Sequence, residues 1–521
     1  LFAAALLGSC TQPAAEENYT RHVDPKIGTG GHGHVFVGAN VPFGLVQVGP
    51  TSIPQTWDWC SGYHASDSTV IGFSHTHLSG TGIGDLFDIT VMPVVGEVTY
   101  ARGEENDPAS GLWSYADRTR EITKPGYYSV PLVRYGITAE LTATERVGLH
   151  RYTFPASDAA AVVFDLENGG CWDKATDTGF RFSDDSTRIA GWRCSTGWAK
   201  NQEVYFVAEF SKPAKGISYL QPGEIDDSKM PRIAARYARV DFDTAEGEQV
   251  LVKVALSPVS IEGAKANLAA ELPGWDFDAT AAAADKAWND ELSKVKIETE
   301  DETSKRIFYT ALYHTMVAPS LFCDVNGDYR GADGKVHENP GRDTYTTFSL
   351  WDTYRAAMPL MTVLHPERMP DIIQTMLHIA DEQGRLPVWH LWGNETDCMV
   401  GNPGIVAVAD AIVKGIGGFD REKAFEAIRK TAMNPDRGNG LRMEYGYIPC
   451  EMFNEAVAYD MEYALADGAA ARAAETLGKA EDAKYFEERS HSYRNYFDPQ
   501  TGFMRGRDSR KGWRTPFLSL I

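Results

Sequence analysis

Hydrophobic residues follow two different periods in the two halves of the chain. From about residue 20 to 270 they come in short runs with strand-like spacing, as at 161–164, 204–207 and 250–252, and turn residues separate the runs. Such runs predict an antiparallel β-sandwich of many strands. Near Thr280 the spacing becomes that of helices. The pattern therefore predicts a sandwich followed by a helical domain.

The second half is predicted to contain about eight or nine helices joined by long polar and aromatic loops. Apolar residues recur at helical spacing over 308–316, and the run stops at Pro319. Pro403 is placed to begin another helix, and Asp420 to cap a third. Further helical segments are predicted near 350–380, 451–466 and 480–496. Paired helices with long loops at one end are typical of an α/α toroid.

The chain divides on this pattern into four segments. We expect a leader over 1–18, a sandwich domain over 19–270, a linker helix over 271–298 and a helical domain over 299–521. At 521 residues the chain exceeds what one hydrophobic core usually supports, which favours two domains or more.

Composition and charge narrow the class of partner. The chain is 43% hydrophobic and 11% aromatic, which is typical of a globular protein. Its formal net charge of -22 repels nucleic acid phosphates and anionic lipid head groups. We therefore expect a neutral substrate and no nucleic acid partner.

The first ten residues, LFAAALLGSC, resemble the end of a signal sequence. Residues 7–10 resemble a bacterial lipobox, which predicts lipid attachment at Cys10. The alternative is a secreted protein in which Cys10 merely ends an apolar run. No later run has eighteen apolar residues, so we expect a lipid anchor alone, at the periplasmic or outer surface of a bacterial membrane.

The remaining cysteines and the histidines of the first half indicate no metal site. The cysteines, none in a CxxC pair, are Cys60, Cys171, Cys194, Cys323, Cys398 and Cys450. Cys171 and Cys194 could pair, or could be buried free thiols. The spacing of the histidines between His22 and His77 fits no metal-binding pattern.

The stretch 57–88 concentrates aromatic rings, imidazoles, acids and glycines. Trp57 and Trp59 alternate, as do His75 and His77, so each pair would project from one face of a strand. The glycines at 80, 82 and 84 would let the chain turn tightly and approach a ligand closely. The alternative is an aromatic sandwich core followed by a glycine turn.

Two segments of the second half place tryptophan beside acids. Trp351 and Asp352 begin a predicted helix, and a predicted loop over 389–398 holds Trp392, Asn394 and Glu395. Sugars stack their CH faces on aromatic rings, and their hydroxyls need paired donors and acceptors. Asp352 and Glu395 could each accept hydrogen bonds from two hydroxyls. For Asp352 the alternative is a helix-end salt bridge with Arg355.

Two further acidic segments have structural explanations of equal or greater weight. Glu451 is either functional or a first-turn acid favoured by the dipole of the next helix. Residues 324–328, DVNGD, resemble part of a calcium loop but lack the later glutamate, which favours a solvated turn.

Taken together, several motifs resemble glycoside hydrolase family 92, the calcium-dependent, exo-acting α-mannosidases. The resemblance extends over about 23–517. Its motifs are DPKIGTGGHGHVFVGANVPFGLVQVGP, WDWCSGYH, GFSHTHLSGTGIGD, FSLWDTYR, LPVWHLWGNETDCMVGN and FDPQTGFMRGR. As a set they are highly specific.

The resemblance implies a fold and a reaction. The fold is an N-terminal β-sandwich packed on a C-terminal (α/α)6 barrel, with the active site at their junction. The reaction is release of terminal α-mannose from N-glycans with inversion, which requires an acid and a base about 6.5–9.5 Å apart. The resemblance also implies calcium, gripping the 2- and 3-hydroxyls of the mannose.

Seven residues match family motifs at that junction and are expected to shape the sugar pocket. They are Trp57, Trp59, Trp351, Asp352, Trp392, Asn394 and Glu395. The family's acid glutamate, base aspartate and calcium ligands are expected beyond Ile521. Catalytic and metal-binding residues are therefore unassigned within this sequence, and the resemblance implies an incomplete barrel.

Two other functions fit the same residues. The first is a non-enzymatic, glycan-binding surface lipoprotein, which needs the tryptophans and hydroxyl acceptors but no acid and base. The second is a different toroid glycosidase whose acid and base come from Asp352, Glu395 or Glu451. Saturable mannose binding without turnover would favour the first, and activity with calcium chelated would favour the second.

Overall fold

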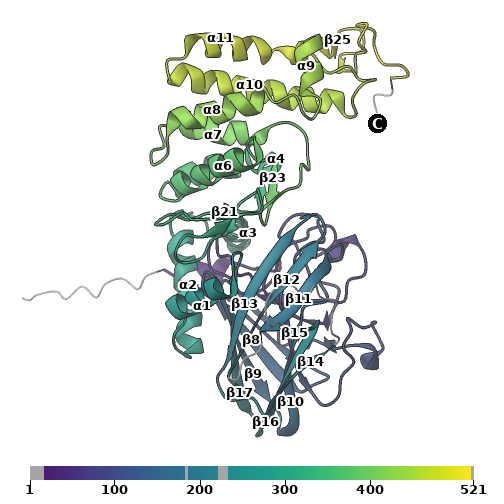
Figure 1. Ribbon diagram of the computed structural model, residues 1–521, viewed down its shortest axis with the longest axis vertical. Helices are drawn as coiled ribbons and strands as arrows, with labels where there is room; N and C mark the ends of the chain where they lie inside the picture. The colour runs from purple at the N-terminus through teal and green to yellow at the C-terminus, as the bar shows by residue number, and fades with distance from the viewer. Residues whose placement is uncertain (1–16, 182–185, 221–232, 518–521) are drawn as a thin grey trace, which may run out of the picture.

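The computed structural model describes residues 17–181, 186–220 and 233–517. A β domain forms one end of the molecule, and a stack of helices extends from it toward the C-terminus (Figure 1). The predicted order, an antiparallel sandwich followed by a helical domain, is confirmed.

Two antiparallel sheets form the β domain. The six-stranded sheet has the order β1-β3-β4-β10-β16-β14, and the nine-stranded sheet has the order β15-β11-β12-β13-β17-β9-β8-β7-β6. The strands of the first are β1 (Gly49–Thr51), β3 (Gly72–Ser74), β4 (Thr90–Val95), β10 (Ser157–Asp165), β14 (Gly216–Leu220) and β16 (Tyr237–Thr244). Those of the second are β6 (Ile122–Lys124), β7 (Tyr127–Leu132), β8 (Ile137–Ala143), β9 (Val147–Phe154), β11 (Lys174–Arg181), β12 (Arg188–Thr196), β13 (Gln202–Phe210), β15 (Ile233–Ala234) and β17 (Glu248–Ser257). A separate pair joins β2 (Thr69–Val70) to β5 (Ser114–Tyr115).

The predicted apolar runs supply the facing surfaces of the two sheets. The run at 161–164 lies in β10 and is fully buried, while β13 alternates buried and partly exposed residues over its first half. Phe164 of β10 stacks on Phe206 of β13, with ring centroids 5.9 Å apart. Contact between these rings joins the sheets face to face, as expected for a sandwich.

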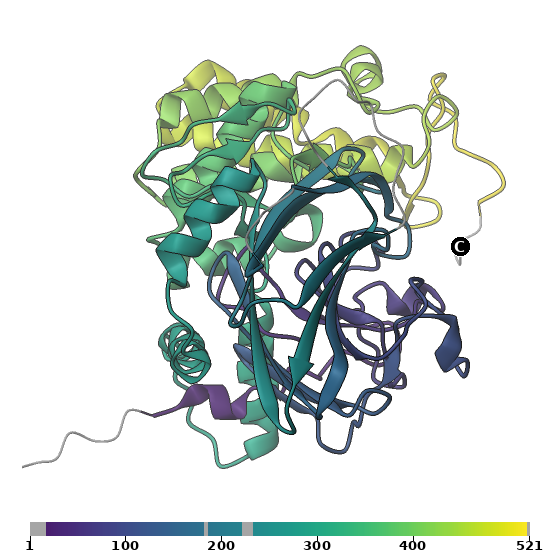
Figure 2. The ribbon, with the colours of Figure 1, turned by 60° about the horizontal axis from the view of Figure 1, so that its bottom comes forward.

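Two helices connect the sandwich to the helical domain. Helix α1 (Ile261–Glu271) packs on β13 and β17, and α2 (Phe277–Leu292) packs on β8. Both lie at the same side of the sandwich in the two views (Figures 1 and 2). The side chain of Asp276 caps α2 by accepting the N–H of Ala279. Helix α2 falls within the predicted linker helix.

Nine helices follow in the described part of 299–521. They are α3 (Glu302–His314), α4 (Leu350–Thr353), α5 (Ala357–Leu364), α6 (Met369–Gln383), α7 (Pro403–Val413), α8 (Arg421–Ala432), α9 (Asn439–Tyr445), α10 (Ala456–Thr476) and α11 (Ala480–Arg489). Pro403 begins α7 and Asp420 caps α8, as predicted. The later helices form an open stack (Figure 1). In the described chain, none of the helices combines the length and apolarity needed to cross a bilayer.

One predicted helix begins later than expected. Helix α10 starts at Ala456, so Glu451 lies five residues before it rather than in its first turn. The Glu451 carboxylate instead accepts the backbone N–H of Ser509, 2.8 Å away. Its partner is therefore the C-terminal segment and not the α10 dipole.

The helical domain also contains short antiparallel strand pairs. One small sheet joins β22 (Phe348–Ser349), β23 (Trp389–Leu391) and β24 (Asn394–Glu395). The segment 389–398, predicted as a loop, is thus in part a β-hairpin. Its turn is formed by Trp392 and Gly393, which both have positive φ values, 46° and 76°. The other pairs are β18 (Ser320–Leu321) with β21 (Tyr345–Thr346), and β19 (Tyr329–Arg330) with β20 (Val336–His337).

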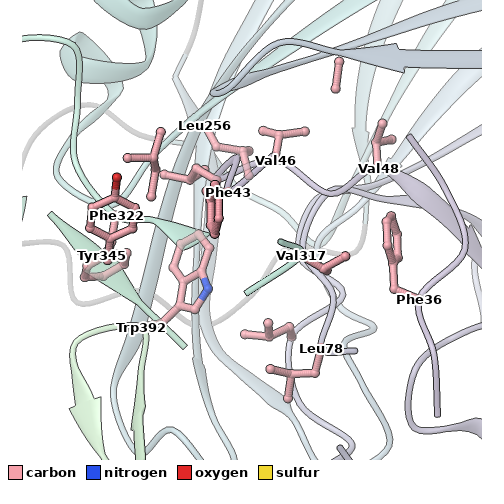
Figure 3. Close-up of a cluster of buried hydrophobic side chains, with 14 of the residues drawn as sticks. Phe36, Phe43, Val46, Val48, Leu78, Leu256, Val317, Phe322, Tyr345 and Trp392 are labelled. Atoms are coloured by element: carbon pink, nitrogen blue, oxygen red, sulfur yellow. The ribbon is translucent and has the colours of Figure 1, made fainter. Parts of the chain in front are cut away.

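A continuous hydrophobic core crosses from the sandwich into the helical domain. Figure 3 shows Phe43 and Leu256 of the sandwich beside Phe322 and Trp392 of the helical domain. All four side chains are at most 3% exposed. The Phe43 backbone N–H also donates to Met316, and its carbonyl accepts the N–H of Leu321. The two domains therefore share one core.

Candidate active site

A cavity of about 280 Å³ lies at the junction of the two domains. Five parts of the chain line it: the sandwich loop 78–81, the end of α3 with the following 315–319, the segment 347–353, α5, and Trp389 of β23. Its volume is near the lower end of the range of about 300–1,000 Å³ that small-molecule sites occupy. Residues of both domains are therefore needed to enclose this space.

Asp352 is the only carboxylate among the described residues that line the cavity. It lies on α4, is exposed, and accepts a hydrogen bond from the hydroxyl of Ser349. The alternative salt bridge with Arg355 is not formed. The Arg355 guanidinium instead donates to Glu462 at 2.6 Å and lies over the ring of Trp351 at 4.9 Å. Lone pairs of Asp352 thus remain for a ligand.

The cavity residues that the sequence did not predict include His314 and Trp389. His314 ends α3, and burial lowers the pKa of its imidazole, so the ring is neutral at pH 7. Trp389 of β23 is 2% exposed and forms another wall. The sequence signal for Trp389 was its place in the 389–398 motif. Of the two tryptophans in that motif, only Trp392 was predicted as a site residue.

Trp57 does not lie on a strand, contrary to the prediction. Residues Trp57–Trp59 form a 3₁₀ turn, η2. The Trp57 indole N–H donates to the carbonyl of Gly82 at 2.8 Å, and its ring meets His34 edge-on at 4.3 Å. A Cβ at residue 82 would lie 2.4 Å from the indole, so Gly82 makes room for Trp57. Trp57 itself remains 51% exposed, and its partner Gly82 directly follows cavity residue Thr81 in the chain.

Trp59 points to a different set of partners. Its ring stacks on His64 at 4.3 Å, and its N–H donates to the carboxylate of Asp67 at 2.7 Å. Because η2 is a turn, the side chains of Trp57 and Trp59 diverge. Between them, Asp58 contacts His32 at 2.6 Å, and the hydrogen bond from His32 lowers the pKa of Asp58.

His75 and His77 belong to the sandwich core. His75 contacts His150 at 2.9 Å and the carbonyl of Ile89 at 2.6 Å, and His77 contacts the carbonyl of Gln47 at 2.8 Å. Burial lowers the pKa of His75 to about 3 and that of His77 to about 4. Both imidazoles are neutral at pH 7, which fits the structural alternative for these two residues.

The side chain of Glu395, in the β23–β24 hairpin, is bonded to backbone N–H groups of nearby residues. Its carboxylate accepts the N–H groups of Val388, Trp389 and Asp397 at 2.8, 2.9 and 3.0 Å. Three charge-assisted hydrogen bonds fix the hairpin and use most of the carboxylate's acceptor capacity. Glu395 is therefore placed to hold the wall of the cavity.

Asn394 and Trp392 also make contacts within the protein. The Asn394 side chain exchanges two hydrogen bonds of 3.0 Å with the backbone of Asn201 in the sandwich. Trp392 is 3% exposed and packs edge-on against Phe322 in the shared core (Figure 3). Of the seven predicted residues, only Asp352 lines the cavity.

The model of the glycosyl hydrolase family 92 N-terminal domain matches residues 22–257, and that of the family 92 catalytic domain matches residues 263–520. This chain belongs to glycoside hydrolase family 92. The two matched regions meet at the cavity, with Leu78 in the first and Asp352 in the second.

Solved family 92 structures have the same fold. A family 92 α-mannosidase from Bacteroides thetaiotaomicron in complex with mannoimidazole is 39% identical, with a TM-score of 0.92 over 96% of this chain and 67% of that one. A family 92 inverting mannosidase from B. thetaiotaomicron VPI-5482 is 29% identical, with a TM-score of 0.85 over 96% of this chain and 68% of that one.

A curated relative from Arthroderma benhamiae is called an uncharacterized secreted glycosidase. It is 26% identical over 559 residues, which cover 98% of this chain and 66% of the relative. The family 92 chain described here thus spans slightly less than two thirds of that relative's length.

The described residues do not form a calcium site of the kind that the resemblance to family 92 implies. Among them, one group of three candidate ligands lies close together: Glu291, His365 and Glu367. The ammonium of Lys294 already contacts both glutamates, at 2.8 and 2.9 Å. Calcium prefers six to eight oxygen ligands, and a site that includes an imidazole and an ammonium does not fit it.

The DVNGD segment at 324–328, predicted as a solvated turn, is only partly exposed to solvent. Asp324 is 3% exposed and accepts hydrogen bonds from Ser257 at 2.9 Å and Asn267 at 2.8 Å. Burial raises the pKa of Asp324 to about 6. Asn326 is exposed, as a solvated turn predicts.

The cysteines in the described ranges are all free thiols. The structure therefore contains no bond between Cys171 and Cys194, which leaves the alternative of unpaired thiols. Cys10, predicted to carry a lipid, lies outside the described residues.

Proposed function

We propose that this protein is an exo-acting α-mannosidase that releases terminal α-mannose from N-glycan-type mannosides with inversion. The observation that carries the proposal is the cavity enclosed by both family 92 domains and lined by Asp352. The fold around it matches, with a TM-score of 0.92, an α-mannosidase solved with mannoimidazole.

In this proposal the described residues bind and orient the sugar. Asp352 accepts hydrogen bonds from sugar hydroxyls, because among the described residues only the hydroxyl of Ser349 is bonded to its carboxylate. Trp389, Met358 and Met361 give the cavity apolar walls against which CH groups pack. Half-exposed Trp57, beside the loop 78–81, is proposed to contact the sugar beyond the cleaved bond.

The acid and base of an inverting reaction are not both in the described cavity. Inversion needs two carboxyl groups about 6.5–9.5 Å apart, and the described lining has one. We therefore assign Asp352 to substrate binding and leave acid and base unassigned. Since the described residues do not fit calcium, we derive no step through a metal. Calcium dependence remains a proposal that rests on the family.

We also propose that the protein acts outside the cytoplasm of a bacterium, anchored by lipid at Cys10. The proposal rests on the signal-like sequence before Cys10 and on a relative called secreted. Labelling with a radioactive fatty acid tests it. Incorporation that is lost in Cys10→Ala supports the anchor, and incorporation that survives in Cys10→Ala contradicts it.

The function is tested by measuring mannose release from a Man-α-1,2-Man disaccharide, with calcium and with a chelator. Calcium-dependent release that Asp352→Asn lowers at least tenfold supports both the activity and the role of Asp352. Equal release in the presence of chelator would instead favour a metal-independent toroid glycosidase.

The single cavity carboxylate also favours a second candidate, a glycan-binding protein without activity. For this function, calorimetry would show saturable binding of the mannobiose while no mannose appears. Asp352→Asn would then weaken binding.

A further inference from the structure

The sandwich loop 197–201 is built against the wall of the cavity. This loop joins β12 to β13 and contacts the β23–β24 hairpin of the helical domain. The Trp198 ring meets the Trp389 ring edge-on, with centroids 4.6 Å apart and an interplanar angle of 66°. Asn201 exchanges two backbone hydrogen bonds with the Asn394 side chain. The loop thus contacts the hairpin that contains cavity residue Trp389.

A buried acid fixes this loop. Asp85 is 0% exposed, and its carboxylate accepts the N–H of Trp198 at 3.0 Å and that of Ala199 at 2.8 Å. A Cβ at residue 197 would lie 2.2 Å from the Asp85 carboxylate, so Gly197 allows the close approach. Asp85 follows directly after the glycine-rich 80–84, whose Gly80 and neighbouring Thr81 line the cavity.

The backbone and the side chain of Trp389 are fixed by different residues. Glu395 fixes its backbone by accepting its N–H at 2.9 Å. Nothing in that bond sets the direction of the indole, which depends on the rings and side chains packed against it. Trp198 is the aromatic side chain with a ring contact to Trp389 in the described chain. Edge-to-face packing of this kind is a preferred arrangement of aromatic pairs.

We propose that Asp85 and Trp198 are positioning residues: Asp85 fixes the loop 197–201, and Trp198 in turn sets the orientation of Trp389 in the cavity wall. The proposal rests on the proposed function insofar as it takes the cavity's ligand to be a mannoside. Neither residue lines the cavity itself, so both act through Trp389.

The test compares Trp198→Ala and Trp198→Phe with a control, Trp172→Ala. Trp172 is 46% exposed on the neighbouring segment before β11, and its backbone N–H is bonded to Gly84. Three properties are measured on the full chain: affinity for mannoimidazole by calorimetry, the thermal midpoint, and amide hydrogen exchange of Trp389–Leu391.

We expect Trp198→Ala to weaken mannoimidazole binding at least fivefold and to speed exchange of Trp389–Leu391, with a thermal midpoint close to that of the wild type. Trp198→Phe keeps an aromatic edge and should restore most of the affinity. The control Trp172→Ala should match the wild type in affinity and exchange. Wild-type affinity and wild-type exchange in Trp198→Ala would overturn the proposal.

A second variant guards against misfolding of the first. Asp85→Asn replaces one acceptor oxygen by an NH2 group, so only one of the two N–H groups of Trp198 and Ala199 keeps its acceptor. It should speed exchange at Trp198 and Ala199 first, and at Trp389 as well. Unchanged exchange at Trp389 would refute coupling between the loop and the wall. If the wild type does not bind mannoimidazole, the proposed function fails for this chain, and the exchange data still decide the positioning roles.

Discussion

The segments 351–355 and 389–398 have similar compositions, yet they use their acids in opposite ways. Asp352 makes one side-chain hydrogen bond and faces the cavity, whereas Glu395 accepts three backbone N–H groups. The difference lies in the backbone around each acid. The β23–β24 hairpin directs three backbone N–H groups at Glu395, whose carboxylate accepts all of them. Tryptophan beside an acid therefore indicates a ligand site only where the backbone leaves the acid free.

The largest effect that tests this comparison is expected at Glu395. Glu395→Ala leaves three N–H groups without their charged acceptor, and hydrogen bonds to charged groups contribute about 1.5–3 kcal/mol each. Because water replaces part of that loss at this half-buried site, we expect the free energy of unfolding to fall by about 3–5 kcal/mol in urea titrations. The matched variant Asp352→Ala should cost less than about 1 kcal/mol. Equal losses would remove the distinction.

Glu291 extends the comparison to an acid that is paired with cations, and its contribution to stability should depend on pH. Burial alone raises the pKa of Glu291, but the close contacts with His365 at 3.0 Å and Lys294 at 2.8 Å lower it to about 2. Because the folded pKa lies below the unfolded value, this stabilisation is complete above about pH 4.5 and is lost as pH falls toward 2. The wild type should lose about 2 kcal/mol more than Glu291→Gln between pH 6 and pH 3, measured by urea unfolding.

The control for that measurement is the neighbouring Asp290, whose side chain is 51% exposed and paired with Lys286. Asp290→Asn should keep the pH dependence of the wild type. If Glu291→Gln shows the same pH dependence as the wild type, the contacts of Glu291 with His365 and Lys294 do not stabilise the fold.

Asp352 should show the reverse of Glu395, with a loss of function and little loss of stability. Asp352→Asn keeps the shape of the side chain but removes its charge, so bonds from sugar hydroxyls weaken. We expect at least a tenfold fall in mannoside turnover or binding, about 1.4 kcal/mol, with an unchanged thermal midpoint. Ser349→Ala removes the hydroxyl that donates to Asp352 and serves as the control. It should lower mannoside turnover or binding less than Asp352→Asn does. Wild-type kinetics in Asp352→Asn would end its assignment.

The smallest effect is expected for Trp57, on the free energy of unfolding. Its ring is 51% exposed, so Trp57→Ala should lower the free energy of unfolding by about 1 kcal/mol or less. Trp392→Ala, in the shared core, should cost about 3–5 kcal/mol. Chemical denaturation of both variants checks this order, and a Trp57 variant as unstable as the Trp392 variant would show that the ring is structural.

The sequence predicts the domains better than it predicts the partners within the site. Period-two and helical spacings locate the sandwich and the helices, and Pro403 and Asp420 mark helix starts correctly. Trp57 and Trp59 were placed on a strand because a separation of two residues does not distinguish a strand from a 3₁₀ turn.

Partners that lie far away in the chain could not be predicted from local patterns. Asn394 is bonded to Asn201, which lies 193 residues earlier. Arg355 lies one turn from Asp352, yet it pairs with Glu462, 107 residues later. In both cases the packed fold brings a distant residue close, and for Arg355 that residue replaces the predicted local partner.

The insertion of Phe43 into the helical domain constrains how this protein can change during evolution. The backbone of Phe43 is bonded to Met316 and Leu321, and its ring lies under the guanidinium of Arg368 at 4.8 Å. The two regions that family comparison recognises as separate units are therefore not interchangeable parts. A sandwich taken from a distant relative would bring its own version of this contact, and recombination between relatives should succeed only where both sides of the contact are inherited together.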